Sequence, residues 1–145
     1  MPELDIHPVS GDREIEDWRY VHNEIIPADA LSRAEARDRA SRYHLEVGYV
    51  GKVLVACTTV RPPDEHATAT AIVRVLPAHR HQGYGRAAYA RALAKARSLG
   101  ATTIETVVWE PNVDGLKFAL ANGFIEVDRY VLDGAEHAYI TLRLR

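Results

Sequence analysis

A glycine turn at residues 80–85 is the segment of this chain best suited to bind an anion. It reads Arg80-His81-Gln82-Gly83-Tyr84-Gly85. Two glycines separated by one residue let the backbone turn tightly and approach a ligand closely. A helix that begins at such a turn points unpaired N–H groups and the positive end of its dipole toward the ligand. The turn is therefore predicted to bind phosphate.

The elements on either side must position this turn. A β-branched run at residues 71–77 predicts a strand, and Pro77 ends it because proline cannot donate to a sheet ladder. Helix formers fill residues 82–99 and place Tyr89 on an apolar face. Gly100 is typical of the residue that ends a helix. The turn thus lies between a strand and a helix.

Two other phosphate-binding loops have similar sequences. The P-loop requires Lys and then Ser or Thr after its second glycine, whereas Arg86 and Ala87 follow Gly85 here. The dinucleotide fingerprint G-x-G-x-x-A fits residues 83–88, and Glu105 follows at a suitable distance for a ribose contact. That fold opens with its glycine turn, however, and this turn falls past the middle of the chain, after consecutive strand-like segments. The dinucleotide interpretation is therefore less favoured.

The spacing Arg-x-x-Gly-x-Gly in this turn resembles the pyrophosphate loop of the GNAT superfamily of N-acetyltransferases. A later segment contains Val108, Asn112 and a helical run at residues 116–124 that closes on Gly-Phe. It resembles the second motif of the same family. The resemblance covers most of the chain and is strongest over residues 71–124.

The resemblance implies an α+β (α/β) fold in a single domain over residues 1–145. The expected sheet is mixed, mostly antiparallel and twisted, with six to seven strands, a splayed central pair and about four helices. The implied activity is that of an N-acetyltransferase, which moves an acetyl group directly from acetyl-CoA to a primary amine of a small molecule or protein. No metal is implied.

The same resemblance assigns residues to the cofactor. The pantetheine arm of acetyl-CoA would enter the gap between the splayed strands and pair with the backbone of Val73 and Val75. The N–H near Val75 would donate to the thioester oxygen, and Asn112 would contact the cofactor near that end. The pyrophosphate would be held by the turn and the start of the helix, that is, by Arg80, His81, Gln82, Gly83, Tyr84, Gly85 and Arg86.

Two positions depart from the pattern of the family. Ala119 stands where many relatives have a tyrosine that acts as the acid. Residues 68–76 contain no acidic side chain, although a glutamate on this strand often serves as the base. Glu110 is the nearest carboxylate to the predicted cleft and is the predicted base, acting through water. These departures also permit an alternative, a non-catalytic acyl-CoA-binding module.

Composition limits the classes of function. The chain has 145 residues, of which 47% are hydrophobic and 26% charged, as in an ordinary soluble domain. A net charge of −2 creates no field that would attract nucleic acid or an anionic membrane, so neither is expected as a partner. Cys57 is the single cysteine, and the first twenty residues are too charged for a signal peptide. Both features favour a cytoplasmic location.

Periodicity and turn residues predict the remaining elements in the order of the family. A capping-box signature at Ser32 and Glu35 begins a helix that runs to about Tyr43. An earlier helix is predicted over residues 12–26, ended by Pro27. The predicted strands span residues 4–9, 45–50, 53–60, 102–109, 124–132 and 138–144.

The segments without a motif are expected to bind the acceptor amine. They are the two N-terminal helices, the turn at residues 61–66 and the terminal hairpin around Asp133 and Gly134. Acidic side chains in this part of the chain are candidate contacts for a cationic amine. They include Asp29, Glu35, Asp64 and Glu65. A homodimer is also expected, because dimers are common among the proteins that the chain resembles.

Overall fold

Seven strands form one sheet within residues 3–145, the part of the chain that this computed structural model describes. Their order across the sheet is β1-β2-β3-β4-β5-β7-β6. The strands are β1 (Leu4–Pro8), β2 (His44–Val50), β3 (Val53–Arg61), β4 (Thr68–Val75), β5 (Thr103–Trp109), β6 (Phe124–Tyr130) and β7 (Tyr139–Leu144). The expected number of strands is confirmed.

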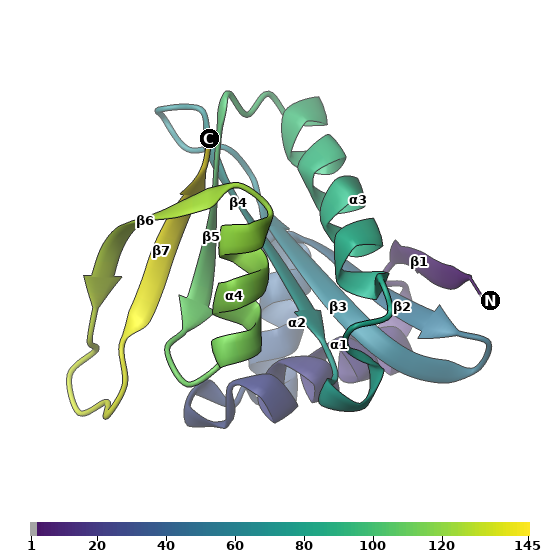
Figure 1. Cartoon of the computed structure of the whole chain (residues 1–145). Helices are drawn as coiled ribbons and strands as arrows, with labels where there is room; N and C mark the ends of the chain where they lie inside the picture. The colour runs from purple at the N-terminus through teal and green to yellow at the C-terminus, as the bar shows by residue number, and fades with distance from the viewer. Residues whose placement is uncertain (1–2) are drawn as a thin grey trace.

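Neighbouring strands are antiparallel except for the central pair, β4 and β5, which is parallel. These two strands pair only from Thr68 with Thr103 to Thr70 with Glu105. Each then continues for four or five residues more, and the two separate toward their carboxyl ends (Figure 1). The predicted splayed pair is therefore confirmed. It leaves an opening in the middle of the sheet, between the carboxyl ends of β4 and β5.

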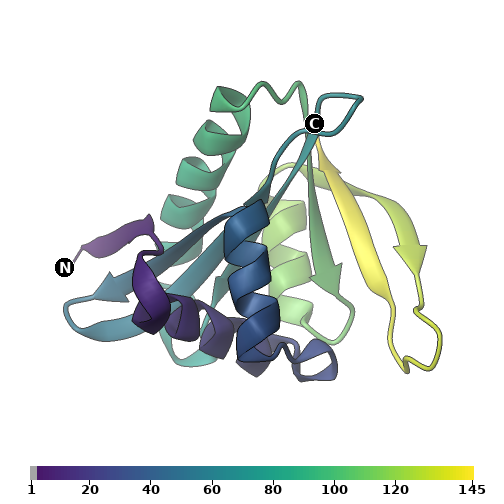
Figure 2. The ribbon, with the colours of Figure 1, turned by 180° about the vertical axis from the view of Figure 1, so that it is seen from behind.

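Helices cover both faces of the sheet (Figures 1 and 2). α1 (Gly11–Ile25) and α2 (Arg33–Arg42) lie on one face, whereas α3 (Tyr84–Ser98) and α4 (Val113–Ala121) lie on the other. Two short 3-10 turns, η1 (Pro27–Asp29) and η2 (Pro77–His79), follow α1 and β4. Within residues 3–145, no helix is both long enough and apolar enough to span a membrane.

The face under α1 and α2 is packed around Trp18, which is fully buried. Its indole N–H donates to the carbonyl oxygen of Thr58 at 3.1 Å, so the bulky ring also meets its polar requirement. The predicted capping box at the start of α2 is confirmed. The Ser32 hydroxyl accepts from the Glu35 N–H at 3.1 Å, and the Glu35 carboxylate accepts from the Ser32 N–H at 2.9 Å.

The opposite face is packed with smaller side chains. Ala92 and Ala96 of α3 are buried against Ala69 and Ala71 of β4. Small residues on both elements let the helix axis lie close to the strand, and this fixes where α3 begins relative to the end of β4. The start of α3 is thereby held beside the opening between β4 and β5.

The predicted boundaries differ from the observed ones mainly at turns. The helix expected from residue 82 begins at Tyr84, because Gly83 adopts a left-handed conformation with φ of 87°. The strand expected over residues 124–132 ends at Tyr130. Gly100 has φ of 100° and ends α3 as predicted.

Candidate active site

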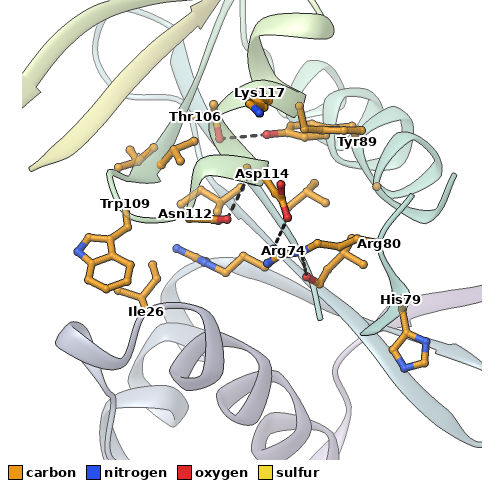
Figure 3. A pocket seen from close by; sticks show the side chains of 18 of the residues that line it. Ile26, Arg74, His79, Arg80, Tyr89, Thr106, Trp109, Asn112, Asp114 and Lys117 are labelled. Carbon is orange, nitrogen blue, oxygen red and sulfur yellow. Dashed lines mark hydrogen bonds and ion pairs between the residues drawn. The ribbon is translucent and has the colours of Figure 1, made fainter. Parts of the chain in front are cut away.

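A cavity of about 360 Å³ occupies the opening between β4 and β5 (Figure 3). It begins where the pairing of the two strands stops, and its walls come from the ends of both strands, the glycine turn, α3 and α4. Parallel sheets bind ligands at such a position, where strands diverge at their carboxyl ends. This cavity is therefore the candidate active site.

The backbone of β4 faces this cavity with polar groups that have no partner on β5, although the carbonyl oxygen of Val75 accepts from Nε of Arg80 at 2.9 Å. The N–H of Leu76 donates to Val55 on β3 at 2.9 Å, so the groups of Leu76 point away from the cavity. Because N–H and C=O directions alternate along a strand, those of Val73 and Val75 point toward β5. The strand β5 no longer pairs at these positions, so an extended ligand could bond there as an added strand.

The glycine turn presents backbone N–H groups at the start of α3. The first helical hydrogen bond joins the N–H of Ala87 to the oxygen of Gly83, which leaves the N–H groups of Tyr84, Gly85 and Arg86 without helical acceptors. His81 also has a left-handed backbone, with φ of 63°. The turn thus combines three free donors with the positive end of the helix dipole.

The two glycines serve different purposes. A Cβ atom on Gly83 would meet no atom within 4 Å, so the residue is needed for its backbone angle and for the open space beside it. A Cβ atom on Gly85 would lie 3.1 Å from the ring of Phe118. Gly85 therefore lets α4 pack against the start of α3.

Arg80 fastens the turn to its surroundings. Its Nε donates to the carbonyl oxygen of Val75 at 2.9 Å, and its Nη1 contacts the carboxylate of Asp114 at 3.1 Å. One side chain therefore links the end of β4, the turn and the first residues of α4. These contacts give Arg80 a positioning role beside its predicted contact with the cofactor.

The predicted cofactor residues divide into two groups. Most line the cavity: Val73, Val75, Arg80, His81, Gly83, Gly85 and Asn112. Asn112 also caps α4, because its side-chain oxygen accepts from the N–H of Gly115 at 3.1 Å. Gln82, Tyr84 and Arg86 lie outside the cavity lining, although the latter two contribute the free N–H groups described above.

Glu110 lies just beyond β5, outside the lining of the cavity. Its carboxylate accepts from Nη1 of Arg129 at 3.0 Å and from the N–H of Ala138 at 3.2 Å. These contacts tie the end of β5 to the β6–β7 hairpin. The side chain remains 41% exposed, so water reaches it. Its role as the base stays a prediction.

Tyr89 was predicted only to lie on the apolar face of a helix, and no part in ligand binding was predicted for it. The Tyr89 hydroxyl lies 3.4 Å from the hydroxyl of Thr106, and its ring stacks on Phe118 with centroids 5.4 Å apart. All three residues line the cavity. The helical spacing of α3 predicted that Tyr89 lies on an apolar face, but it carries no sign that this face lines a cavity.

A second cavity, of about 130 Å³, adjoins the first and is lined in part by residues of α1 and α2. Both cavities are lined by Ile26, Ile72, Arg74, Val107 and Trp109, so they meet across the gap between the strands. The other walls of the second cavity come from α1, α2, the end of β3 and the β6–β7 hairpin. These are largely the segments expected to bind the acceptor.

The acidic residues expected near the acceptor have mostly local roles. Asp29 alone of the four lines the second cavity. Glu35 caps α2, and Asp64 accepts from the N–H groups of His66 and Thr68 at 2.8 and 3.0 Å within its turn. Within residues 3–145, no group of three or more His, Cys, Asp or Glu side chains is placed to hold a metal ion.

His22 in the second cavity makes stability depend on pH. Its burial, assisted by the charge of Arg74, lowers the pKa of His22 to about 3, against about 6.5 in an unfolded chain. Between these values the unfolded state binds more protons, so the free energy of unfolding falls as pH decreases from 6.5. We expect His22→Gln to remove up to about 1.4 kcal/mol per pH unit of this slope.

Urea unfolding at pH 5.0, 5.5, 6.0 and 6.5 measures this slope. The interval lies above the range in which most carboxylates titrate. An equal slope in the wild-type protein and in His22→Gln would show that His22 is not held neutral in the folded protein.

The opening between β4 and β5 and the free N–H groups beside it define a cleft suited to a long anionic ligand. A model of the acetyltransferase (GNAT) family matches residues 11–124, and the chain therefore belongs to this family. Members of the family use acetyl-CoA, and the unpaired β4 backbone with the free N–H groups of the turn suits its pantetheine arm and diphosphate. No curated protein matches the chain in sequence.

Solved structures share the fold at low sequence identity. A candidate phosphinothricin N-acetyltransferase has a TM-score of 0.81 and 18% identity, over 99% of this chain and 98% of that one. Ard1 from Thermoplasma volcanium has a TM-score of 0.78 and 17% identity, over 98% of both chains. The third structure is yncA, a candidate acetyltransferase from Salmonella typhimurium, with its cofactor acetyl-CoA. It has a TM-score of 0.76 and 16% identity, over 99% of this chain and 94% of that one.

Proposed function

We propose that this protein transfers the acetyl group of acetyl-CoA directly to a primary amine. The observation that carries the proposal is the meeting of two cavities between β4 and β5. The first suits a long cofactor with a diphosphate, and the second opens from the other face of the sheet. An amine in the second cavity would reach the first cavity through the gap between β4 and β5, where the two cavities share their lining.

The residues of the first cavity would hold and orient the cofactor. The N–H groups at the start of α3 would bind the diphosphate, and the backbone of Val73 and Val75 would pair with the pantetheine arm. Acetyl-CoA supplies an activated thioester. The N–H of Val75 would donate to its carbonyl oxygen, and such a donor stabilises negative charge that develops during acyl transfer. Positioning two reactants in this way can supply much of the rate.

Direct transfer is favoured over an acetylated cysteine. Cys57, the single cysteine of the chain, is fully buried on β3. Burial raises the pKa of Cys57 to about 12, so the thiolate that would act as nucleophile is not formed near neutral pH. The cytoplasm is the proposed location, because a lone thiol suits a reducing compartment.

The proton of the amine would leave through water to Glu110. The Arg129 and Ala138 contacts of this carboxylate compete with that role. Ala119 is fully buried against Tyr89 and Phe124, so the position where relatives have a tyrosine provides no acid here. The chain must therefore release the thiolate by other means, such as water in the open cavity.

Glu110→Gln separates the two roles of this residue. Loss of a general base lowers kcat by about 10²- to 10⁴-fold. Loss of the hairpin contacts alone leaves kcat within about tenfold and instead lowers the melting temperature. Steady-state rates from pH 6 to 9, with a melting curve for each variant, distinguish these outcomes.

Release of coenzyme A tests the proposed function. The purified protein is mixed with acetyl-CoA and a panel of amines, and free thiol is followed with a chromogenic disulfide reagent. Amine-dependent release, with an acetylated amine found by mass spectrometry, is the expected result. Tight binding of acetyl-CoA without release for any amine would contradict transferase activity.

A further inference from the structure

Three arginine side chains from three elements line the second cavity. They are Arg39 of α2, Arg61 at the end of β3 and Arg74 of β4. Among residues 3–145, no carboxylate lies within 4.0 Å of a nitrogen of these three side chains. Asp29 is the one carboxylate that the described lining contains, and its Oδ2 lies 3.7 Å from Nε2 of His22. Since burial keeps His22 neutral, the lining carries three positive charges and one negative charge.

Arg74 is the most unusual of the three. Its exposed fraction is 9%, and it stands opposite Cys57 in the β3–β4 pairing, on the face covered by α1. A buried guanidinium without a counter-ion costs stability, and proteins rarely retain one unless it is paired. Arg61 adds a second unmet requirement, because its buried Nε has no hydrogen-bond partner within the described residues.

Arg74 points away from the predicted phosphate site. In Figure 3 its guanidinium extends toward Trp109 and Ile26, whereas Arg80 and the glycine turn lie at the other end of the cavity. The phosphates of the cofactor are therefore not its partner. The missing negative charge must arrive with a different ligand.

We propose that the acceptor carries an oxyanion that these arginines bind, so that the acceptor is a small amine with a carboxylate or a phosphorus oxyanion. This inference rests on the proposed function. An amino acid has this chemistry, because its amine lies two bonds from its carboxylate. The shared lining of the two cavities places the anion site next to the inner end of the cofactor site, which suits such a short separation.

The remaining lining fits a polar acceptor. Tyr130 and Tyr139 stack with ring centroids 5.8 Å apart at the β6–β7 hairpin, and both line the second cavity. Burial raises the pKa of Tyr139, so its hydroxyl stays protonated and can donate to an oxyanion. Asp29 is the group available to a cationic amine. Together these residues provide donors around an anion and one acceptor for the ammonium group.

Matched substrates test the charge requirement. The panel contains amino acids, the amines formed by removing their carboxylate, their methyl esters and aminoalkylphosphonates. We expect the compounds with an oxyanion to have kcat/KM values at least about tenfold above those of their uncharged partners, because hydrogen bonds to charged groups are strong. Comparison of amino acids with phosphonates identifies which oxyanion is preferred.

Matched variants test the arginines. Arg74→Met is expected to raise KM for the charged acceptor at least about tenfold, while KM for acetyl-CoA changes less than twofold. It should also raise the melting temperature of the ligand-free protein, because it removes an unpaired buried charge. Arg39→Met should give a smaller increase in KM. Arg37→Met is the control on the same helix, since Arg37 is exposed and outside the cavity.

Each outcome decides the inference. If the uncharged amines are the better substrates, the inference is wrong and the transferase function stands. If Arg74→Met raises KM for acetyl-CoA instead, Arg74 belongs to the cofactor site and the inference is wrong. If Arg74→Met does not fold, Arg39→Met against Arg37→Met gives the answer.

A binding experiment covers the case in which no amine of the panel reacts. Acetate and inorganic phosphate are titrated separately into the 15N-labelled protein, and the indole N–H of Trp109 is followed by NMR. Saturable shifts in the wild-type protein that Arg74→Met or Arg39→Met abolishes support the anion site, whether or not acetyl-CoA binds. A concentration of 50 mM is on the order of a hundred times a typical substrate KM. Absence of shifts for both anions at this concentration overturns the inference.

Discussion

Replacement of Gly83 by alanine is expected to lower the affinity for acetyl-CoA at least about tenfold. Gly83 has φ of 87°, a conformation that costs an L-residue about 1–2 kcal/mol. A side chain there also enters the open space beside the free N–H groups of Tyr84 and Gly85, where the diphosphate is proposed to lie. The loss of one charge-assisted hydrogen bond accounts for a change of this size.

Gly100 provides a matched control at the other end of α3. It has φ of 100°, and a Cβ atom on it would also meet nothing within 4 Å. Gly100→Ala therefore causes similar backbone strain without touching the proposed site. Calorimetric titration should give a weakened dissociation constant for Gly83→Ala alone, with both variants losing similar stability. Equal dissociation constants for the two variants would contradict the phosphate-binding role of the turn.

Trp18→Ala is expected to reduce the free energy of unfolding by about 3–5 kcal/mol. The side chain is fully buried between α1 and the sheet, stacks on His22 at 5.4 Å and donates to Thr58. Its removal leaves a cavity and takes away one hydrogen bond at the same place. Since natural domains have only about 5–15 kcal/mol in total, a large share of the stability would be lost.

Tyr20 is the control for this prediction. It lies two residues further along α1 and is 53% exposed, so Tyr20→Ala should change the free energy of unfolding by less than about 0.5 kcal/mol. Urea unfolding followed by circular dichroism measures both variants. A loss below 1 kcal/mol for Trp18→Ala would show that α1 does not depend on this side chain to cover the sheet.

Local sequence signals predicted the elements because each signal has a short-range cause. Ser32 and Glu35 form their capping box within one turn, and Gly100 ends α3 through its own backbone angle. The splayed central pair was expected only from the family resemblance, and the order of the strands across the sheet was not predicted. A strand pairing such as β5 with β7 joins segments about 30 residues apart, and local periodicity contains no information on it.

The proposed cofactor residues could be predicted because they lie in two short sequence motifs that resemble those of the family. The proposed acceptor site could not be predicted, because Arg39, Arg61 and Arg74 come from three elements and meet only in the folded chain. One signal was present. Arg74 is the one charged residue of β4, and a charge at an inward position of a buried strand indicates a function.

The contacts of Arg80 also could not be predicted from local sequence. Its place in the motif predicted a cofactor contact, but its bonds to Val75 and Asp114 depend on where α4 packs. The sequence separation of Arg80 and Asp114 is 34 residues, so no local pattern predicts the pair. The same packing of α4 explains why residue 85 is glycine, because a Cβ atom there would crowd the ring of Phe118. The sequence of the turn gave no sign of this contact.

NMR titration of the 15N-labelled protein with coenzyme A tests the central claim most directly, because it reports where the cofactor binds. We expect saturable shifts that are largest for the backbone N–H groups of Val73, Val75, Tyr84 and Gly85. These four groups lie at the two places where the chain has unpaired donors beside the opening between β4 and β5. Coenzyme A does not bind in this opening if these resonances stay unchanged at millimolar coenzyme A, or if the shifts map to another face of the sheet.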